Sequence, residues 1–182
     1  IYEGRAYAFG TMGMLGCLDA RSGRAIWRRD LVKENGAVVP TWGFAASPFI
    51  WKDTLFIHCG ARPRGSVLAL DPATGAERWR AGDDRAGYCA PVVIEHQGAS
   101  QLIQWGPENI AAFSPLDGKE LWRALSAKEP GYAPPMIYNF AGRRQLILWH
   151  PESVNALDPD VVAIGGGVAG LTQTQVNLGA DE

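Results

Sequence analysis

The fold is decided by the eleven residues Ala-Leu-Asp-Pro-Ala-Thr-Gly-Ala-Glu-Arg-Trp at positions 69–79, because the chain repeats them. An earlier copy occupies residues 17–27, a later one occupies residues 112–122, and a fourth begins at Ala156 and then breaks off. The glycines of the three complete copies lie 52 and 43 residues apart. Self-similarity at a period of this size predicts an array of similar supersecondary units.

Each copy reads as a strand, a tight turn and a second strand. In residues 66–79 a short apolar run is followed by Asp71, Pro72 and Gly75, and then by a strand that carries Trp79. Asp bonds the backbone two residues further on, Pro presets φ, and Gly accepts a positive φ, so these residues favour a hairpin turn.

The segments between the copies read as further hairpins. Residues 47–51 with 54–58 form one such pair, and glycine-containing turns separate the later pairs. We therefore predict about fourteen strands: the last three of one four-stranded unit, complete units at residues 43–82 and 87–125, and the first three strands of another. Four strands in a period of about 40–50 residues are typical of a β-propeller blade, with almost no helix before residue 160.

A tryptophan stands eight residues after the aspartate position in every complete copy, at Trp27, Trp79 and Trp122. A large aromatic side chain at a fixed register predicts a packing contact between neighbouring sheets. These three side chains are therefore expected to be largely buried at equivalent places. The alternative is a ring that stacks on a sugar or a quinone, although a binding site rarely needs the same residue in every unit.

The pattern Ala-x-Asp-x-x-Thr-Gly-x-x-x-Trp resembles the tryptophan-docking motif of quinoprotein-type propellers, the PQQ-like repeat family. Residues 69–79 match every fixed position, whereas other copies depart, for example with Cys17 in place of Ala and Ser114 in place of Asp. The resemblance covers residues 1–159. It implies an all-β, partial propeller of four-stranded antiparallel blades in a periplasmic or otherwise exported protein.

The family includes alcohol and sugar dehydrogenases that bind pyrroloquinoline quinone (PQQ) and calcium, and also non-enzymatic outer-membrane assembly scaffolds. The dehydrogenases typically carry two adjacent cysteines, whereas Cys17, Cys59 and Cys89 are dispersed and no Cys-x-x-Cys-His occurs. We expect a non-catalytic scaffold that binds a protein or a ligand without a cofactor or metal. The alternative is part of a dehydrogenase with PQQ and calcium, whose site residues lie in missing blades.

Aromatic residues precede the first strand of three units, at Trp42, Phe44, Tyr88 and Tyr132. In a propeller such loops open near the central channel, so these residues are candidates for binding a ligand or peptide. Packing between blades is the alternative. The Arg-Pro-Arg segment at residues 62–64 and Glu108 are expected to be ordinary loop residues.

The charge and composition of the chain argue against some classes of function. A net charge of −2 gives no basic surface of the kind that binds nucleic acid. No apolar run approaches the roughly 18 residues of a membrane helix. The chain starts at Ile1 rather than Met and is expected to be a fragment.

Residues 160–182 abandon the repeat and are expected to form a separate, truncated β-α tail. The stretch reads as a strand, a Gly-x-Gly-x-x-Gly loop at Gly165, Gly167 and Gly170, and a helix. It resembles the start of the dinucleotide-binding fold in alanine dehydrogenase and transhydrogenase sequences, which would make these glycines candidate cofactor contacts. A natural fusion, a joined sequence and a chance glycine-rich tail remain open, and a single β-α unit is not expected to hold NAD.

Overall fold

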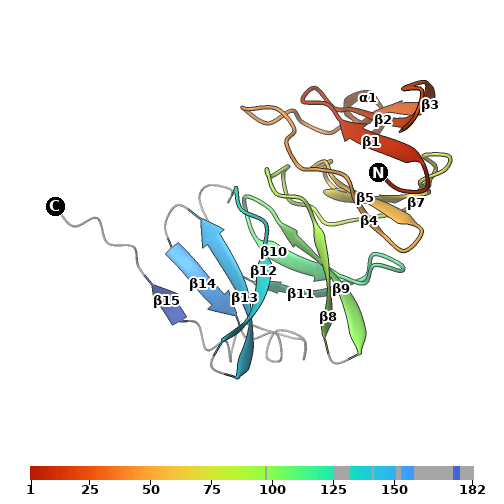
Figure 1. Ribbon diagram of the computed structural model, residues 1–182. Helices are drawn as coiled ribbons and strands as arrows, with labels where there is room; N and C mark the ends of the chain where they lie inside the picture. Colours follow the sequence, from red (N-terminus) through yellow and green to blue (C-terminus); the bar gives the residue numbers. More distant parts are fainter. Residues whose placement is uncertain (97, 125–131, 141, 151–152, 158–173, 177–182) are drawn as a thin grey trace.

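This computed structural model describes residues 1–182 apart from positions 97, 125–131, 141, 151–152, 158–173 and 177–182. The described chain forms four consecutive antiparallel sheets, as the sequence predicts (Figure 1). In each sheet the strands lie in sequence order, so each strand pairs with the next along the chain. The sheets are named sheet 1 to sheet 4 in chain order.

Sheets 1 and 2 are built from the N-terminal half of the chain. Sheet 1 has β1 (Arg5–Phe9), β2 (Met14–Asp19) and β3 (Ala25–Asp30). Sheet 2 has β4 (Phe49–Trp51), β5 (Thr54–His58), β6 (Val67–Leu70) and β7 (Glu77–Ala81).

Sheets 3 and 4 follow in the same way. Sheet 3 has β8 (Val92–His96), β9 (Ala99–Trp105), β10 (Ile110–Phe113) and β11 (Glu120–Ala124). Sheet 4 has β12 (Met136–Phe140), β13 (Arg143–His150), β14 (Ser153–Leu157) and β15 (Thr174–Val176). Sheets 2 and 3 are the two complete units predicted from the sequence.

The described part of the chain contains one short helix, α1 (Leu31–Asn35), between sheets 1 and 2. Its N-terminus is capped by the Asp30 side chain, which accepts a hydrogen bond from the backbone N–H of Lys33, and Gly36 ends it in the left-handed region. No helix in the described residues is long and apolar enough to cross a membrane.

The predicted aspartate turns are present. The Asp71 carboxylate accepts the backbone N–H of Thr74 at 2.9 Å, and Gly75 adopts a φ of 74°. The equivalent carboxylate of Asp19 accepts the N–H of Ser22 at 2.7 Å. These bonds close the hairpin locally, so the turn does not depend on packing for its shape.

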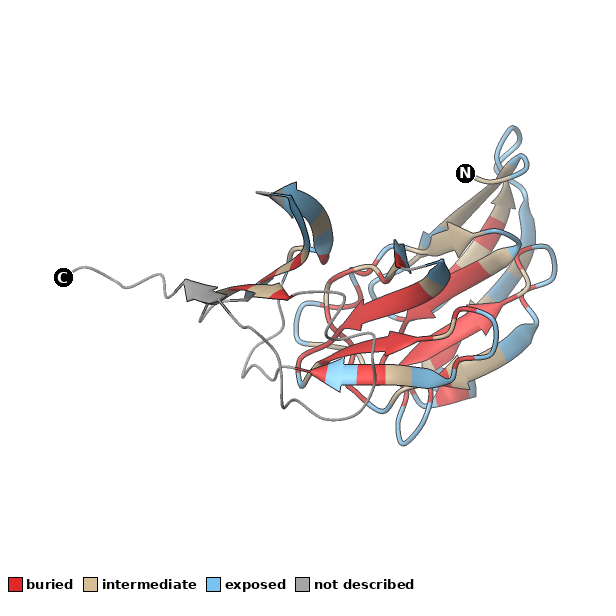
Figure 2. Cartoon of the chain, turned by 90° about the horizontal axis from the view of Figure 1, so that it is seen from below, coloured by how far each residue is buried: buried red, intermediate tan, exposed pale blue. Residues whose placement is uncertain are grey.

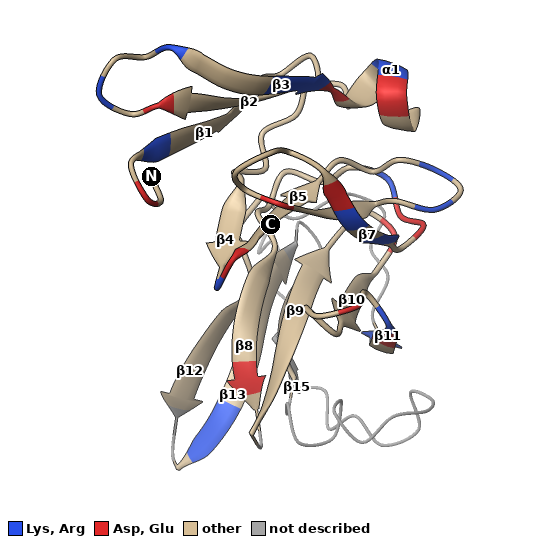
Figure 3. Cartoon of the chain, turned by 90° about the vertical axis from the view of Figure 1, so that its right-hand side faces the viewer, with Lys and Arg blue, Asp and Glu red and all other residues tan. Residues whose placement is uncertain are grey.

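Apolar side chains fill the three spaces between successive sheets. Strands β5 and β6 are buried on both faces, because sheet 2 lies between two neighbours. Figure 2 shows the buried residues concentrated along these inner strands. Lys, Arg, Asp and Glu instead gather on turns and on the outer strands β3, β7 and β11 (Figure 3).

The repeated tryptophans occupy equivalent register positions. Trp27 pairs with Cys17, and Trp79 pairs with Ala69, each next to a shift in register. Each ring lies against the turn glycine of the following sheet: Trp27 against Gly75, and Trp79 against Gly118. The expected equivalence is therefore present.

The expected burial of the tryptophans is only partly present. Trp122 is 8% exposed, whereas Trp27 and Trp79 are half-buried. All three belong to the outermost strands of their sheets, and Trp122 differs in that its ring N–H donates to the buried side chain of Gln101 at 2.8 Å.

The sequence predicts a helix after the glycine-rich loop, and the strands of sheet 4 show that this prediction is wrong. Thr174–Val176 forms β15, which pairs antiparallel with β14. Open backbone groups on β14 offer a strand template that local helix propensity does not outweigh. The three candidate glycines at 165, 167 and 170 lie outside the described residues, and the domain boundary at residue 160 stays a prediction.

Candidate functional site

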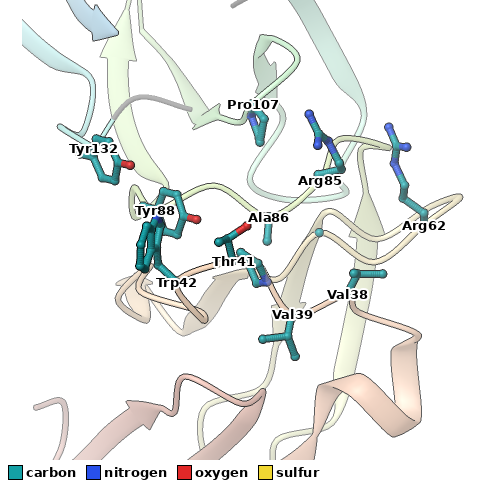
Figure 4. A pocket seen from close by; sticks show the side chains of 12 residues that line it. Val38, Val39, Thr41, Trp42, Arg62, Arg85, Ala86, Tyr88, Pro107 and Tyr132 are labelled. Carbon is teal, nitrogen blue, oxygen red and sulfur yellow. The ribbon is translucent and has the colours of Figure 1, made fainter. Parts of the chain in front are cut away.

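A cavity of about 660 Å³ opens where the loops between the sheets converge (Figure 4). Its walls come from the loop that enters sheet 2, the β5–β6 loop, the β7–β8 loop, the β9–β10 loop and the residues before β12. The side chains used below are those of Val38, Trp42, Arg62, Arg85, Tyr88 and Tyr132. We call this cavity the loop pocket.

Three of the four aromatic residues predicted from the sequence meet in the loop pocket. Tyr88 and Tyr132 are stacked, with ring centroids 5.2 Å apart and an angle of 9° between the planes. Figure 4 places Trp42 on the same side of the pocket as these two rings. Trp42 is 75% exposed and Tyr132 is 63% exposed, so both present ring surface to a ligand.

The fourth candidate, Phe44, does not line the loop pocket. It is 1% exposed and packs against Phe9, with ring centroids 4.8 Å apart. The positive φ of Gly43 redirects the chain, and the Phe44 N–H bonds the carbonyl of Thr11 in sheet 1 at 2.9 Å. Phe44 therefore belongs to the core between sheets 1 and 2, which is the packing alternative for these aromatic residues.

The opposite side of the loop pocket carries two arginines that share one carboxylate. Arg62 contacts Glu108 at 2.7 Å, and Arg85 contacts the other oxygen of Glu108 at 3.1 Å. Arg62 also donates to the carbonyl of Asp83 at 2.9 Å. The carboxylate of Asp84 lies in the same loops, so this wall is polar and combines two guanidinium groups with two carboxylates.

A buried carboxylate fixes these loops to one another. Asp84 accepts the backbone N–H groups of Arg85, Glu108 and Asn109 at 2.7–3.2 Å, and it is 2% exposed. Burial raises the pKa of Asp84, while the three N–H donors oppose that shift. A side chain at Gly106 would overlap this carboxylate, so glycine is required there.

A second buried polar cluster, formed by Ser66, Gln104 and His58, contacts the β7–β8 loop. The hydroxyl of Ser66 donates to Oε1 of Gln104 at 2.8 Å, and Nε2 of Gln104 lies 2.9 Å from Nε2 of His58. The N–H of Gly87 points at the same histidine nitrogen at 3.4 Å. The same nitrogen also lies 3.2 Å from the carbonyl oxygen of Arg85, so His58 contacts the β7–β8 loop at two backbone positions. Burial lowers the pKa of His58 to about 4, so this imidazole is neutral at pH 7.

The acidic groups around the loop pocket do not fit a calcium ion with a bound quinone. The oxygens of Glu108 are engaged by two guanidinium groups, and those of Asp84 by backbone N–H groups. Calcium requires several free oxygen ligands that converge on one point. In the part of the chain that the structure describes, no group of three or more His, Cys, Asp and Glu side chains could hold a metal.

The cysteines do not form the adjacent pair of the dehydrogenases. Cys17, Cys59 and Cys89 are buried in separate places. Burial raises the pKa of Cys59 to about 11 and that of Cys89 to about 12, so both thiols stay protonated at pH 7. They act as small core side chains.

Sequence reasoning missed the charged half of the loop pocket. Arg62 and Glu108 were expected to be ordinary loop residues, and Asp84 and Arg85 carried no motif. Their contacts join loops that are 23 and 46 residues apart, so no local spacing reports them. The one available signal was Gly106 beside Pro107, a dipeptide that marks a constrained turn.

Comparisons with known proteins agree with this fold. The family model described as outer membrane protein assembly factor BamB matches residues 11–160. None of the curated proteins matches the sequence.

Several solved structures share the fold. Quinohemoprotein alcohol dehydrogenase from Comamonas testosteroni is 16% identical with a TM-score of 0.64, covering 87% of this chain and 32% of that one. Quinohemoprotein alcohol dehydrogenase ADHIIG from Pseudomonas putida HK5 is 14% identical with a TM-score of 0.71, covering 98% and 34%. BamB from Moraxella catarrhalis is 18% identical with a TM-score of 0.61, covering 87% and 44%. The chain thus spans less than half the length of each structure.

Proposed function

We propose a function from the premise that this chain belongs to the PQQ-like β-propeller family: it is a non-catalytic part of a scaffold that binds a protein or ligand in the loop pocket. The family model and the solved structures support the fold and leave the role open between enzymes and scaffolds. The contents of the loop pocket favour the scaffold.

The observation that carries this proposal is the meeting of Trp42, Tyr88 and Tyr132 in one pocket. These residues come from three successive connections between sheets, so the pocket depends on the packed array rather than on one unit. Exposed aromatic rings bury large apolar area on binding at a small entropic cost, which makes them common anchors of recognition sites.

The family description favours a protein, rather than a small ligand, as the partner of the proposed scaffold. The matching model is described as an outer membrane protein assembly factor. A segment of a partner that carries hydrogen-bond acceptors would bond the guanidinium groups of Arg62 and Arg85, while an apolar side chain would contact the rings. We place the protein in the periplasm or another exported location on the same family grounds.

Site-specific photo-crosslinking tests this proposal. A photoreactive phenylalanine analogue replaces Trp42 in the exported protein, and Leu116 serves as the matched control because it is 77% exposed and lies outside the loop pocket. The proposal predicts an adduct with an outer-membrane assembly protein from position 42 and none from position 116. Equal adducts from both positions, or none from position 42, contradict it.

The second candidate is a segment of a PQQ-dependent dehydrogenase. The shared fold with two quinohemoprotein alcohol dehydrogenases favours it, whereas the engaged carboxylates and separate cysteines do not. In that case the residues that hold the quinone would lie in other blades. Dye reduction by alcohols with added PQQ and calcium distinguishes the candidates: turnover that saturates with PQQ supports the enzyme, and its absence in the full-length protein supports the scaffold.

A further inference from the structure

The side chains of the loop pocket are rich in hydrogen-bond donors. Arg62 and Arg85 each carry five N–H groups, and Arg62 uses Nε on the carbonyl of Asp83 and Nη2 on Glu108, while Arg85 uses Nε on Glu108. These contacts occupy only part of either guanidinium group. The indole of the exposed Trp42 adds one N–H and no acceptor.

The carboxylates beside the loop pocket are already engaged as acceptors. Both oxygens of Glu108 accept guanidinium N–H groups, at 2.7 and 3.1 Å. The Asp84 carboxylate accepts three backbone N–H groups and is 2% exposed. A ligand that brought N–H or O–H donors of its own would leave some of them without a partner, which costs binding free energy. The pocket therefore suits a ligand with many acceptors and few donors.

The other wall of the loop pocket supplies flat apolar surface. Tyr88 and Tyr132 stack with their ring centroids 5.2 Å apart, and Trp42 lies on the same side. In Figure 4 the small residue Ala86 lies between this aromatic wall and the arginine wall at Arg85. An extended segment can therefore contact the rings with its side chains and the guanidinium groups with its carbonyl oxygens.

We propose that the loop pocket binds a proline-rich segment of a protein partner in the polyproline II conformation; this inference rests on the proposed function and names the chemistry of the partner. Proline has a carbonyl acceptor and no N–H donor, which matches the donor-rich lining. A polyproline II segment makes no internal hydrogen bonds, so its carbonyls stay open to Arg62 and Arg85. Its rings dock on aromatic side chains, and its preformed backbone loses little entropy on binding.

Isothermal titration of the purified chain with an acetylated, amidated peptide of about nine prolines, which is about three turns of polyproline II, tests the proposal. A glycine–serine peptide of the same length brings N–H groups and no rings, and a neutral trisaccharide stacks on aromatic rings but brings hydroxyl donors. We expect saturable binding of the proline peptide alone, with a Kd below about 1 mM. No saturation by the proline peptide, or equal or tighter binding of either control, overturns the proposal.

Variants locate the binding site. Trp42→Ala removes one ring and Arg85→Gln removes a guanidinium group, and each should weaken binding of the proline peptide about tenfold. Leu116→Ala is the matched control and should bind as the unmodified chain does, because Leu116 is 77% exposed and lies outside the loop pocket. Circular dichroism confirms that each variant is folded. Unchanged binding by the folded Trp42→Ala variant would place the peptide elsewhere and contradict the proposal.

The titration and the crosslinking experiment at position 42 can fail separately. A crosslinked adduct from a chain that does not bind the proline peptide would keep the scaffold function and reject the proline-rich segment. Binding of the proline peptide that Trp42→Ala weakens, without an adduct to an outer-membrane assembly protein, would support the chemistry of the loop pocket and reject that partner.

Discussion

The indole ring of Trp27 lies directly against Gly75 of the neighbouring sheet, so close that a methyl group on Gly75 would come within 2.9 Å of ring atom Cδ2. The ring N–H donates to the carbonyl of Pro72 at 3.0 Å, in the same turn. Trp79 and Gly118 repeat the contact between the next two sheets. Sheet 2 is therefore positioned by a glycine turn against Trp27 on one side and by Trp79 against a glycine turn on the other.

Gly75→Ala is expected to lower the free energy of unfolding by about 3 kcal/mol, from a left-handed backbone and a clash with the Trp27 ring. Gly23→Ala is the matched control, because Gly23 has a φ of 71° in the same kind of turn and open space around it. Gly23→Ala should lower the free energy of unfolding by only about 1 kcal/mol, which is the cost of an alanine in the left-handed backbone region. Urea denaturation gives both values, and equal losses would show that the ring does not constrain Gly75.

Trp79→Ala should lower the free energy of unfolding by about 3 kcal/mol. The ring is half-buried, packs against Phe56 with centroids 5.6 Å apart, and covers Gly118. Trp42→Ala serves as the comparison, since this exposed tryptophan should change stability by less than about 0.5 kcal/mol. Thermal melts of the two variants report the difference, and a Trp79→Ala midpoint equal to that of Trp42→Ala would disprove the packing role.

Stability is expected to fall as pH is lowered from 6.5 to 4 because of His58. Burial lowers its folded-state pKa from 6.5 to about 4, so between these values the unfolded chain binds the extra proton. The stabilisation that depends on neutral His58 is fully present above pH 6.5, and about 3 kcal/mol of it is lost by pH 4. His58→Gln removes this titration, so its stability should depend less steeply on pH. Parallel urea titrations at each pH check this, and identical slopes would contradict it.

Two acids of the loop pocket should respond differently to substitution. Asp84→Ala leaves buried N–H groups of Arg85, Glu108 and Asn109 without their acceptor, at a cost of about 3 kcal/mol. Glu108→Gln weakens only ion pairs to half-exposed arginines and should cost less than about 1 kcal/mol. Chemical denaturation ranks the two, and the reverse order would show that the ion pairs, not the buried carboxylate, hold the loops together.

The repeat made much of the fold predictable from sequence. Asp71 and Gly75 determine the turn locally, and the constant spacing to Trp79 reports a packing contact. The half-burial of Trp79 was not predictable, because the same motif position is buried at Trp122 and the difference arises from contacts outside the motif. The strand at Thr174–Val176 was missed for a similar reason: pairing with β14 decides its structure.

The loop pocket was predictable only in its aromatic half. Tyr88 and Tyr132 each stand three residues before the proline that precedes a first strand, so the repeat relates them, whereas Trp42 stands six residues before the corresponding proline. Phe44 stands only two residues from Trp42, yet the turn at Gly43 sends it into the core. The charged half depends on contacts between distant loops, which spacing in the sequence does not reveal.

Tryptophans that pack against glycine turns, as Trp27 packs against Gly75, position neighbouring sheets and hence the loop pocket. A double-mutant cycle on Trp27 and Gly75 tests this most directly. Stabilities of the unmodified chain, Trp27→Ala, Gly75→Ala and the double variant are measured by urea denaturation. With the ring removed, the cost of Gly75→Ala should fall from about 3 to about 1 kcal/mol, a coupling of about 2 kcal/mol. The same cost of Gly75→Ala in both backgrounds would contradict the account.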